Sequence, residues 1–426
     1  MSTQTTTQQL TAMGQRARAA ALKLARLSTE VKNRALLNIA SALEERSDQV
    51  VAANRKDYQA GQRNGLNEGL LDRLLLNHER LAGMAGDVRT IAELPDPVGE
   101  EYDVRTLPNG LIRARRTVPL GVIGAIYESR PHVTVDIAAL CLKSGNAVIL
   151  RGGSEAYQSN RALSALVRDA IASAGVPEDA VQFVDSTDRS LVAEMLRMKE
   201  YIDLLIPRGG ADLVRRVAEE ATMPAVTGGI GVCHTYVDEA ADLDKAVEIA
   251  FNAKVQRPSV CNALDALLVH SQVAPRYLPL IARRWSDAGV EIHADKRTLS
   301  ILGPENGLNV SPATDEDWGK EFLSLTAAVK VVDSFDEAIA HIDSYGSGHS
   351  EAIVTEDQAT ADRFLDDVDA AVVFTNASTR FNDGAEFGLG SEVAISTSKM
   401  HARGPMGLRE LTSYKWTVRG SGQVKP

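Results

Sequence analysis

The chain has few cysteines, no long apolar run and no excess of positive charge. Its 426 residues include three cysteines, Cys141, Cys233 and Cys261, and these form no CxxC pair. Cysteines this sparse exclude a disulfide framework, and no His and Cys spacing matches a zinc site, so no metal is expected. No stretch approaches the about 20 consecutive apolar residues of a membrane-spanning helix. The formal net charge of −11 argues against a broad nucleic-acid surface, which requires a basic face.

The rest of the composition is that of a folded protein in a reducing compartment. Apolar residues make up 44% of the chain and charged residues 24%. The polar, Thr- and Gln-rich segment 1–10 has neither the basic residues nor the apolar run of a secretion signal. A local cluster of Arg and Lys inside an acidic surface still allows an anionic small substrate. We therefore expect a cytoplasmic protein that acts on a small molecule, with no nucleic-acid or membrane partner.

Apolar segments of strand length alternate with amphipathic segments of helical period from residue 121 onward. Before them, apolar residues recur at spacings of three and four, which predicts helices over 17–27 and 32–51. Apolar strands separated by helices indicate parallel sheets covered on both faces, so we predict an α/β fold of two domains joined at the Gly-rich segment 227–231. The expected strands are 121–127, 147–150, 181–184, 202–206, 232–237, 264–270, 352–354 and 371–374, and the expected helices between them are 135–142, 159–173, 211–220, 243–253 and 275–288.

A different pattern occupies 102–118. Extended residues lie on either side of Pro108-Asn109-Gly110, which favours a tight hairpin turn. This segment is either a surface hairpin or an arm that pairs with a partner subunit, and residue types alone do not choose between them. Near the end of the chain, strand-like residues recur at Tyr414 and Trp416.

Two strand-to-helix turns have the residues that hold phosphate. One is Arg151-Gly152-Gly153-Ser154, and the other is Pro207-Arg208-Gly209-Gly210. Glycine lets backbone N–H groups approach a phosphate, the following helix adds a favourable dipole, and each turn carries an Arg. Neither turn is the GxGxxG fingerprint, and a Gly-Gly turn is often plain loop geometry. Two such turns in one α/β unit nevertheless favour a dinucleotide-binding domain.

Cys261 is the candidate nucleophile among the three cysteines. Cys141 lies in the apolar helix expected over 135–142 and Cys233 in an expected strand, where both fill space. Cys261 instead lies in a loop with Lys254 and Arg257 close by in sequence. A cation near a thiol lowers its pKa and raises the thiolate fraction that a nucleophile needs. A cysteine that serves only in packing is the alternative.

Two histidines have distinctive surroundings. His349 lies in Tyr345-Gly346-Ser347-Gly348-His349-Ser350-Glu351, a segment too rich in glycine to be only core. His132 follows Pro131 at an expected helix start, where capping explains it.

Four long segments of the sequence are distinctive: VPLGVIGAIYESRP, VQRPSVCNA, VVDSFDEAIAHIDSYGSGHSEAI and FNDGAEFGLGSEVAISTSKMHARGPMGL. They resemble the gamma-glutamyl phosphate reductase family of the aldehyde dehydrogenase superfamily. Several long motifs in the right order are far more specific than one short pattern. The resemblance runs from about residue 17 to the end. It implies two Rossmann-like α/β domains and a β oligomerisation arm, with 1–97 and 119–227 binding NADP, 228–385 catalytic, and 98–118 and 386–426 forming the arm and the C-terminal return.

The resemblance also implies a reaction and a set of site residues. L-glutamate 5-phosphate would be reduced by NADPH to L-glutamate 5-semialdehyde and phosphate, the second step of proline biosynthesis. The resemblance further implies a functional link to glutamate 5-kinase and an assembly as homodimer or homotetramer. By position, Cys261 is the nucleophile and Glu321 matches the glutamate that binds the nicotinamide ribose. Arg151 would suit an adenosine 2′-phosphate, and the turn of Pro207, Arg208, Gly209 and Gly210 falls at the pyrophosphate.

The chain departs from hydrolytic aldehyde dehydrogenases at two points. Val226 stands where they carry the Glu that activates water, which fits an enzyme that exchanges phosphate. Their oxyanion Asn is also replaced, near Ser129. The substrate's carboxylate and phosphate need cationic partners, and the candidates by loop position are Arg130, Arg257, His349 and Arg380, all of which could instead be solvated charges.

Two other functions remain open from the sequence. A hydrolytic aldehyde dehydrogenase is one, and Val226 argues against it. A noncatalytic nucleotide-binding relative is the other, and the presence of Cys261 and of the His349 segment argues against that.

Overall fold

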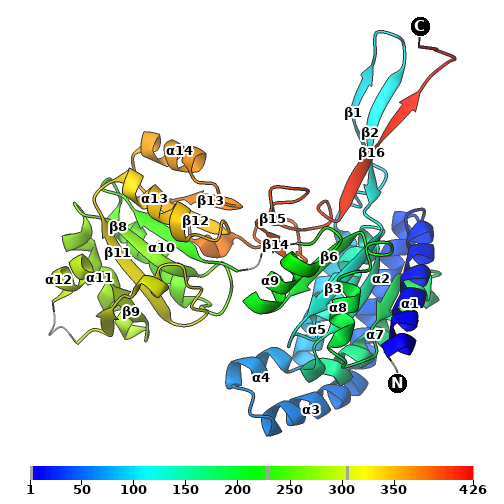
Figure 1. Cartoon of the computed structure of the whole chain (residues 1–426), viewed down its shortest axis with the longest axis horizontal. Helices are drawn as coiled ribbons and strands as arrows, with labels where there is room; N and C mark the ends of the chain where they lie inside the picture. Colours follow the sequence, from blue (N-terminus) through cyan, green and yellow to red (C-terminus); the bar gives the residue numbers. More distant parts are fainter. Residues whose placement is uncertain (1–2, 227, 229, 304–306, 426) are drawn as a thin grey trace. The chain divides into compact units, whose positions relative to one another are not determined.

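The structure is a computed structural model and describes residues 3–226, 228, 230–303 and 307–425 (Figure 1). The chain folds into two compact units. Unit 1 comprises Met1–Thr227, Gly388–Ala394 and Met406–Pro426, and unit 2 comprises Gly228–Phe387 and Ile395–Pro405. The assignment of cofactor binding to the first and of catalysis to the second stays a prediction. No helix among the described residues is long and apolar enough to cross a membrane.

Unit 1 begins with five helices. They are α1 (Thr3–Leu24), α2 (Thr29–Glu45), α3 (Ser47–Arg63), α4 (Glu68–Leu74) and α5 (His78–Glu93). The single helix expected over 32–51 is wrong, because the chain leaves helical geometry at Arg46, with φ −106° and ψ 19°. The buried positions explain the break, since they recur in α2 as far as Leu43 and resume only at Val50 in α3.

A four-stranded parallel sheet forms the centre of unit 1, in the order β5-β4-β3-β6. Every residue of β3 and β4 is buried, as expected for strands covered on both faces. The order reverses beside β3, and ligands of open α/β sheets bind at the carboxyl ends of strands next to such a reversal. The strands are β3 (Val122–Tyr127), β4 (Ala147–Gly152), β5 (Val181–Phe183) and β6 (Leu204–Arg208), and the helices are α6 (Val133–Lys143), α7 (Tyr157–Ser173), α8 (Ser190–Met195) and α9 (Ala211–Glu220), with short 3-10 turns at Ser154–Ala156 and Glu178–Ala180.

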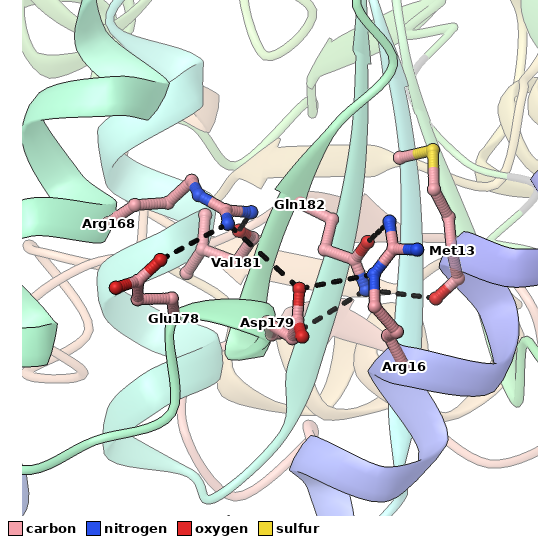
Figure 2. Close-up of polar contacts among 7 residues, drawn as sticks. All are labelled: Met13, Arg16, Arg168, Glu178, Asp179, Val181 and Gln182. Atoms are coloured by element: carbon pink, nitrogen blue, oxygen red, sulfur yellow. Dashed lines mark hydrogen bonds and ion pairs between the residues drawn. The ribbon is translucent and has the colours of Figure 1, made fainter. Parts of the chain in front are cut away.

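Polar contacts cover the edge of this sheet at β5 (Figure 2). Asp179, just before β5, pairs with Arg16 of α1 at 3.3 Å and lies 3.9 Å from Arg168 of α7. Arg168 also donates to the main-chain oxygen of Val181, and Arg16 donates to the side chain of Gln182. Side chains of α1 and α7 therefore occupy polar groups of a strand that has only one neighbour, which blocks its pairing with another chain.

An antiparallel sheet of three strands, β1-β2-β16, belongs to the same unit. β1 (Glu101–Thr106) and β2 (Ile112–Pro119) form the hairpin predicted from the sequence, and Gly110 in its turn has φ 81°. β16 (Thr412–Arg419) pairs with all of β2. Tyr414 and Trp416 on β16 are more than 40% exposed, with the guanidinium of Arg115 over both rings. Pairing of this sheet with a partner subunit stays a prediction.

Unit 2 is built on a seven-stranded, wholly parallel sheet in the order β10-β9-β11-β8-β7-β12-β13. Its largest core cluster includes Trp285 and Tyr277. The parallel sheet predicted from apolar strands is confirmed, although 291–332 showed no pattern clear enough to predict β9, β10 or β11. The strands are β7 (Cys233–Val237), β8 (Leu264–His270), β9 (Glu291–Ala294), β10 (Val310–Pro312), β11 (Thr326–Val332), β12 (Ser350–Val354) and β13 (Val372–Thr375), and a separate pair is β14 (Ile395–Ser396) with β15 (Gly404–Pro405).

Helices connect these strands, as a parallel sheet requires. They are α10 (Leu243–Val255), α11 (Ala274–Asp287), α12 (Lys296–Leu302), α13 (Phe335–Tyr345) and α14 (Gln358–Asp367), with 3-10 turns at Asp315–Asp317 and Thr379–Phe381.

Candidate active site

Four neighbouring strands of unit 2, β11, β8, β7 and β12, bring the candidate catalytic residues to one edge of the sheet. Glu321 precedes β11, Cys261 precedes β8, Gly231 precedes β7 and His349 precedes β12. Because all four strands are parallel, the segments before them meet at the amino edge of the sheet. The order of the strands therefore assembles residues that are spread along the sequence from Gly231 to His349.

Cys261 is the only one of the three cysteines that is not fully buried. Burial raises the pKa of the Cys141 thiol and, with nearby carboxylates, that of the Cys233 thiol. Both therefore stay protonated at neutral pH, and a protonated thiol is a poor nucleophile. The structure thus leaves Cys261 as the one thiol with access to a substrate.

The backbone of Cys261 packs closely against the segment before β7. A Cβ atom at Gly231 would lie 1.6 Å from the main-chain oxygen of Cys261, so only glycine fits there. The Gly231 N–H donates to Oε1 of Glu321 at 2.9 Å, and the Cys233 thiol donates to the Cys261 oxygen at 3.2 Å. Burial, only partly offset by the Gly231 bond, raises the pKa of Glu321 to about 7.

Asn262 anchors the other side of the nucleophile. Its Nδ2 donates to the main-chain oxygens of Arg380 at 3.3 Å and Asn382 at 2.9 Å, and its own main-chain oxygen accepts from Thr379 Oγ1 at 2.8 Å. Asn382 Nδ2 also donates to Ser350 Oγ at 2.7 Å, which joins the Cys261 loop to the His349 segment. Sequence reasoning missed Asn382 and Ser350, because amides and hydroxyls in loops give no periodic signal.

Lys254, one of the two cations close to Cys261 in sequence, is paired elsewhere. Lys254 is fully buried, 3.4 Å from Asp265 Oδ1 and 3.1 Å from the Ser324 oxygen. Its charge is therefore committed to Asp265, and this corrects the expectation that it activates the thiol. Burial and the nearby charge of Arg257 lower the pKa of Arg380, while the charge of a Cys261 thiolate opposes that shift. The charge of a Cys261 thiolate is therefore one of those that act on the Arg380 guanidinium.

His349 does not have the positive charge expected of a partner for substrate anions. It is fully buried, and burial lowers its pKa to about 4, so the ring is neutral at physiological pH. Nδ1 lies 2.7 Å from Ser350 Oγ and 3.8 Å from Cys233 Sγ. The structure therefore makes His349 a packing and hydrogen-bonding partner of the loops beside Cys261. Arg257, by contrast, is exposed.

In unit 1, the expected cofactor residues lie at the carboxyl edge of the four-stranded sheet. Arg151 is the second-last residue of β4 and is 6% exposed, and its Nη1 donates to the Gly152 oxygen at 3.0 Å. Its Nε and Nη2 are buried and have no hydrogen-bond partner among the described residues. Burial lowers the pKa of this guanidinium, with Glu155 opposing the shift. Two buried donors without acceptors are costly unless a ligand supplies acceptors.

The turn after β6 already holds an anion. Pro207 and Arg208 end β6, and Gly210 N–H donates to Oε2 of Glu128 at 2.9 Å at the start of α9. A Cβ atom at Gly209 would lie 2.4 Å from the same oxygen. The N–H at this helix N-terminus thus has a carboxylate as its acceptor, and a phosphate site at this turn stays a prediction.

Ser129 and Arg130 follow β3 at the same edge of the sheet. Ser129 has φ 42°, and both its N–H and its hydroxyl donate to Glu155 Oε1, at 2.5 and 2.9 Å. Arg130 is partly buried, and its main-chain oxygen accepts from Val133 N–H. The structure thus brings Arg151, Gly210 and the Ser129–Arg130 segment to the ends of three adjacent strands. No group of three or more His, Cys, Asp or Glu side chains in the described parts of the chain could hold a metal ion.

Comparison with known proteins connects this geometry to a family. The profile of the aldehyde dehydrogenase family matches residues 2–304. The chain belongs to this family. Gamma-glutamyl phosphate reductases from Dehalococcoides mccartyi and Roseiflexus castenholzii are 57% and 54% identical to it, over 96% of both chains for the first and over 97% of this chain and 98% of the relative for the second.

A solved structure agrees with the two sequence relatives. The crystal structure of gamma-glutamyl phosphate reductase from Thermotoga maritima is 47% identical, with a TM-score of 0.95, and covers 98% of this chain and 100% of its own. The resemblance read from the four motifs is therefore confirmed, and so is the aldehyde-dehydrogenase-like α/β fold. Within the aldehyde dehydrogenase family, the chain groups with the gamma-glutamyl phosphate reductases.

Val226 stands where the resemblance predicts that a hydrolytic base is missing, and it is 4% exposed. Its N–H donates to the Leu205 oxygen at 2.9 Å, which fixes it beside β6. Its apolar side chain takes no proton from water. The correspondence of Val226 with the base of hydrolytic relatives stays a prediction.

Proposed function

We propose that the chain catalyses the NADPH-dependent reduction of L-glutamate 5-phosphate to L-glutamate 5-semialdehyde and phosphate, with Cys261 as nucleophile. The observation that carries this proposal is near full-length identity of 54–57% to gamma-glutamyl phosphate reductases, together with Cys261 as the one accessible thiol. Membership in the aldehyde dehydrogenase family implies a nicotinamide cofactor, and NADPH is the finer part of the proposal.

The chemistry begins at Cys261. Its thiolate forms a bond to the acyl carbon of the substrate, the carbon–oxygen bond to phosphate breaks, and phosphate leaves. Backbone N–H groups stabilise the oxyanion that develops before the phosphate leaves. Arg380, which interacts with the thiolate, is placed to attract an anionic group of the substrate. The buried hydrogen bonds of Asn262 hold the loop so that the thiol stays in position.

The bound cofactor supplies the hydride that reduces the resulting thioester. In unit 1, Arg151 and Gly210 would hold it, and the resemblance assigns binding of the nicotinamide ribose to Glu321. The unpartnered Nε and Nη2 of Arg151 suit the oxygens of an adenosine 2′-phosphate, which distinguishes NADPH from NADH. The Gly210 N–H suits a pyrophosphate oxygen once the Glu128 carboxylate has moved away. Loss of the thiolate from the reduced carbon then releases the aldehyde.

Val226 supports phosphate exchange over hydrolysis. General-base assistance is typically worth about 10²–10⁴-fold, so without a base the thioester should react with water slowly. In the oxidative direction, inorganic phosphate would then be the acyl acceptor. The hydrolytic alternative requires a carboxylate that this position lacks.

The proposal extends to assembly and to the source of the substrate. The exposed Tyr414 and Trp416 on β16 favour a homodimer or homotetramer in which this sheet pairs with a partner. An acyl phosphate must come from a kinase that phosphorylates a carboxylate, which here would be glutamate 5-kinase. Three cysteines without a disulfide fit a cytoplasmic location.

The test is the reverse reaction with purified full-length protein. Glutamate semialdehyde should reduce NADP⁺ only when phosphate is present, and arsenate should replace phosphate. NAD⁺ should be the poorer acceptor at equal concentration. Rapid, sustained turnover after enzymatic removal of phosphate would establish hydrolysis and overturn the proposal.

A further inference from the structure

The guanidinium of Arg380 is held by two neutral amides. Nε donates to Gln256 Oε1 at 2.9 Å, and Nη1 donates to Asn262 Oδ1. Gln256 directly follows the last residue of α10, and Asn262 directly follows the nucleophile. Both tethers come from the loop that carries Cys261, so the orientation of Arg380 depends on that loop.

No carboxylate forms an ion pair with Arg380 in the part of the chain that the structure describes. Asp383 acts on it electrostatically, but Oδ1 of Asp383 accepts from the Ala385 N–H. The like charge of Arg257 adds to the positive potential. A guanidinium held by neutral amides keeps a net positive charge that can attract an anion. If a carboxylate held it, the pair would be neutral and would attract an anion much less.

Lys254 is a buried cation with a structural role, and its partner differs from that of Arg380. It is buried, and Asp265 neutralises it. Arg380 is treated differently, since the side chain that accepts from its Nε is an amide in a position where a carboxylate of the same shape would form the stronger hydrogen bond. The weaker acceptor leaves more of the guanidinium charge available to an anion.

We propose that Gln256 is a positioning residue for the reaction: it orients the Arg380 guanidinium beside Cys261 and, being an amide, leaves the charge available to an anionic group of the acyl phosphate substrate. This rests on the proposed function. It adds that a neutral acceptor at position 256 is required, so that Gln256→Glu, which strengthens the tether, weakens the site.

The experiment compares the full-length chain with Gln256→Glu and Gln256→Met, and with Gln272→Glu as the control. Gln272 is exposed on unit 2, so that variant adds the same charge elsewhere. The first readout is the rate of Cys261 alkylation by iodoacetate, an anion, divided by the rate with neutral iodoacetamide. Mass spectrometry identifies Cys261 as the alkylated residue. Any change in thiolate fraction affects both reagents equally and cancels in the ratio. The second readout is KM for the substrate.

The ranking of the variants by alkylation ratio and by KM distinguishes the inference from a purely structural role of Gln256. We expect the alkylation ratio to fall about tenfold in Gln256→Glu and less in Gln256→Met, with KM rising in the same order and kcat changing less. Gln272→Glu should match the unmodified chain. A tether that serves only structure predicts the reverse order, with Glu as good as Gln and Met the worst.

Gln256→Glu with an unchanged ratio and an unchanged KM would overturn the inference. Failure of the proposed function looks different, because the unmodified chain would then show no substrate-dependent turnover while its alkylation ratio could still be measured. Far-UV circular dichroism identifies a variant that has not folded. If Gln256→Glu does not fold, Gln256→Met is compared with a further variant, Arg380→Met. The inference requires Gln256→Met to keep a higher alkylation ratio than Arg380→Met.

Discussion

The two candidate sites lie at opposite edges of their parallel sheets. In unit 1, Arg151 lies near the end of β4 and the turn at Gly210 follows β6, both at the carboxyl edge, where helix N-termini present N–H groups to a ligand. In unit 2, Cys261 and Glu321 precede strands, at the amino edge, where the loops are bound to one another. The carboxyl edge of unit 1 has hydrogen-bond donors available to a ligand. At the amino edge of unit 2, the donors bond to neighbouring loops and hold the thiol in place.

The hydrogen-bonding state of the side chains shows the same difference. Arg151 has two buried nitrogen atoms without partners among the described residues, and the Gly210 N–H is occupied by the exposed, displaceable carboxylate of Glu128. Around Cys261, the amides of Asn262 and Asn382 bond across from one loop to another. A site that exchanges a ligand in each turnover needs groups that change partners, whereas a nucleophile needs a fixed environment.

The largest expected effect tests whether the fixed edge is the chemical one. Cys261→Ala should lower turnover by at least about 10³-fold, because it removes the atom that bonds to the substrate, while cofactor affinity and circular dichroism stay unchanged. Cys141→Ala in α6 is the control and should keep its activity. If Cys261→Ala stayed active and Cys233→Ala lost its activity instead, the assignment of Cys261 as the nucleophile would be wrong.

The next effect tests whether the fixed edge depends on its buried ion pair. Lys254→Met leaves Asp265 buried without its cation, and breaking such a pair typically costs about 3–5 kcal/mol of the free energy of unfolding. Urea denaturation measures it. Lys245→Met, which breaks the exposed contact with Glu356, is the matched control and should cause no measurable change. Equal effects in the two variants would mean that the buried pair adds nothing to the rigidity of this edge.

Much of the fold was predictable, because apolar periodicity reports burial. The strands around 122–127, 147–152 and 264–270 and the hairpin before β3 follow from local pattern alone. Strand order does not, since it depends on pairings between distant segments. The break at Arg46 was missed because the amphipathic pattern continues past it with a change of face.

The site was predictable only where a residue type is rare or a motif is long. Cys261 is one of three cysteines, and Arg151 stands in a Gly-rich turn after a strand. Proximity in sequence misled at Lys254, because α10 directs that side chain into the core, toward Asp265. His349 misled for a related reason, since a Gly-rich segment hides the burial that lowers its pKa to about 4. Gln256 and Asn382 carry no sequence signal, and only the structure shows what they hold.

A smaller effect tests whether the exchanging edge reads the cofactor. Arg151→Met should weaken NADPH binding about 10- to 100-fold and NADH binding far less, because a charge-assisted hydrogen bond is worth about 1.5–3 kcal/mol. Fluorescence titration gives both dissociation constants. Arg161→Met on α7, where the arginine pairs with exposed Asp185, is the control. An equal loss for the two cofactors would place Arg151 away from the 2′-phosphate and leave it a structural residue.

The smallest effect concerns Glu321, whose carboxyl is part of the fixed edge. Burial raises its pKa from 4.5 to about 7, so the folded chain keeps this proton over a range of pH in which the unfolded chain has lost it. The stabilisation from this proton is complete below pH about 4.5 and declines as pH rises toward about 7. Glu321→Gln removes the titration but keeps an oxygen that accepts from the Gly231 N–H.

Between pH 5 and 7.5 the free energy of unfolding of the unmodified chain should therefore fall more than that of Glu321→Gln, by on the order of 1–2 kcal/mol. Urea denaturation at the two pH values measures both changes, and titrating groups that do not interact with Glu321 cancel in the comparison. Glu316→Gln, at an exposed position, should behave as the unmodified chain does. If Glu321→Gln and the unmodified chain lose the same stability, the carboxyl is already ionised at pH 5. The amino edge would then be open enough to water to solvate a charge, and the contrast between a fixed edge and an exchanging edge would not extend to Glu321.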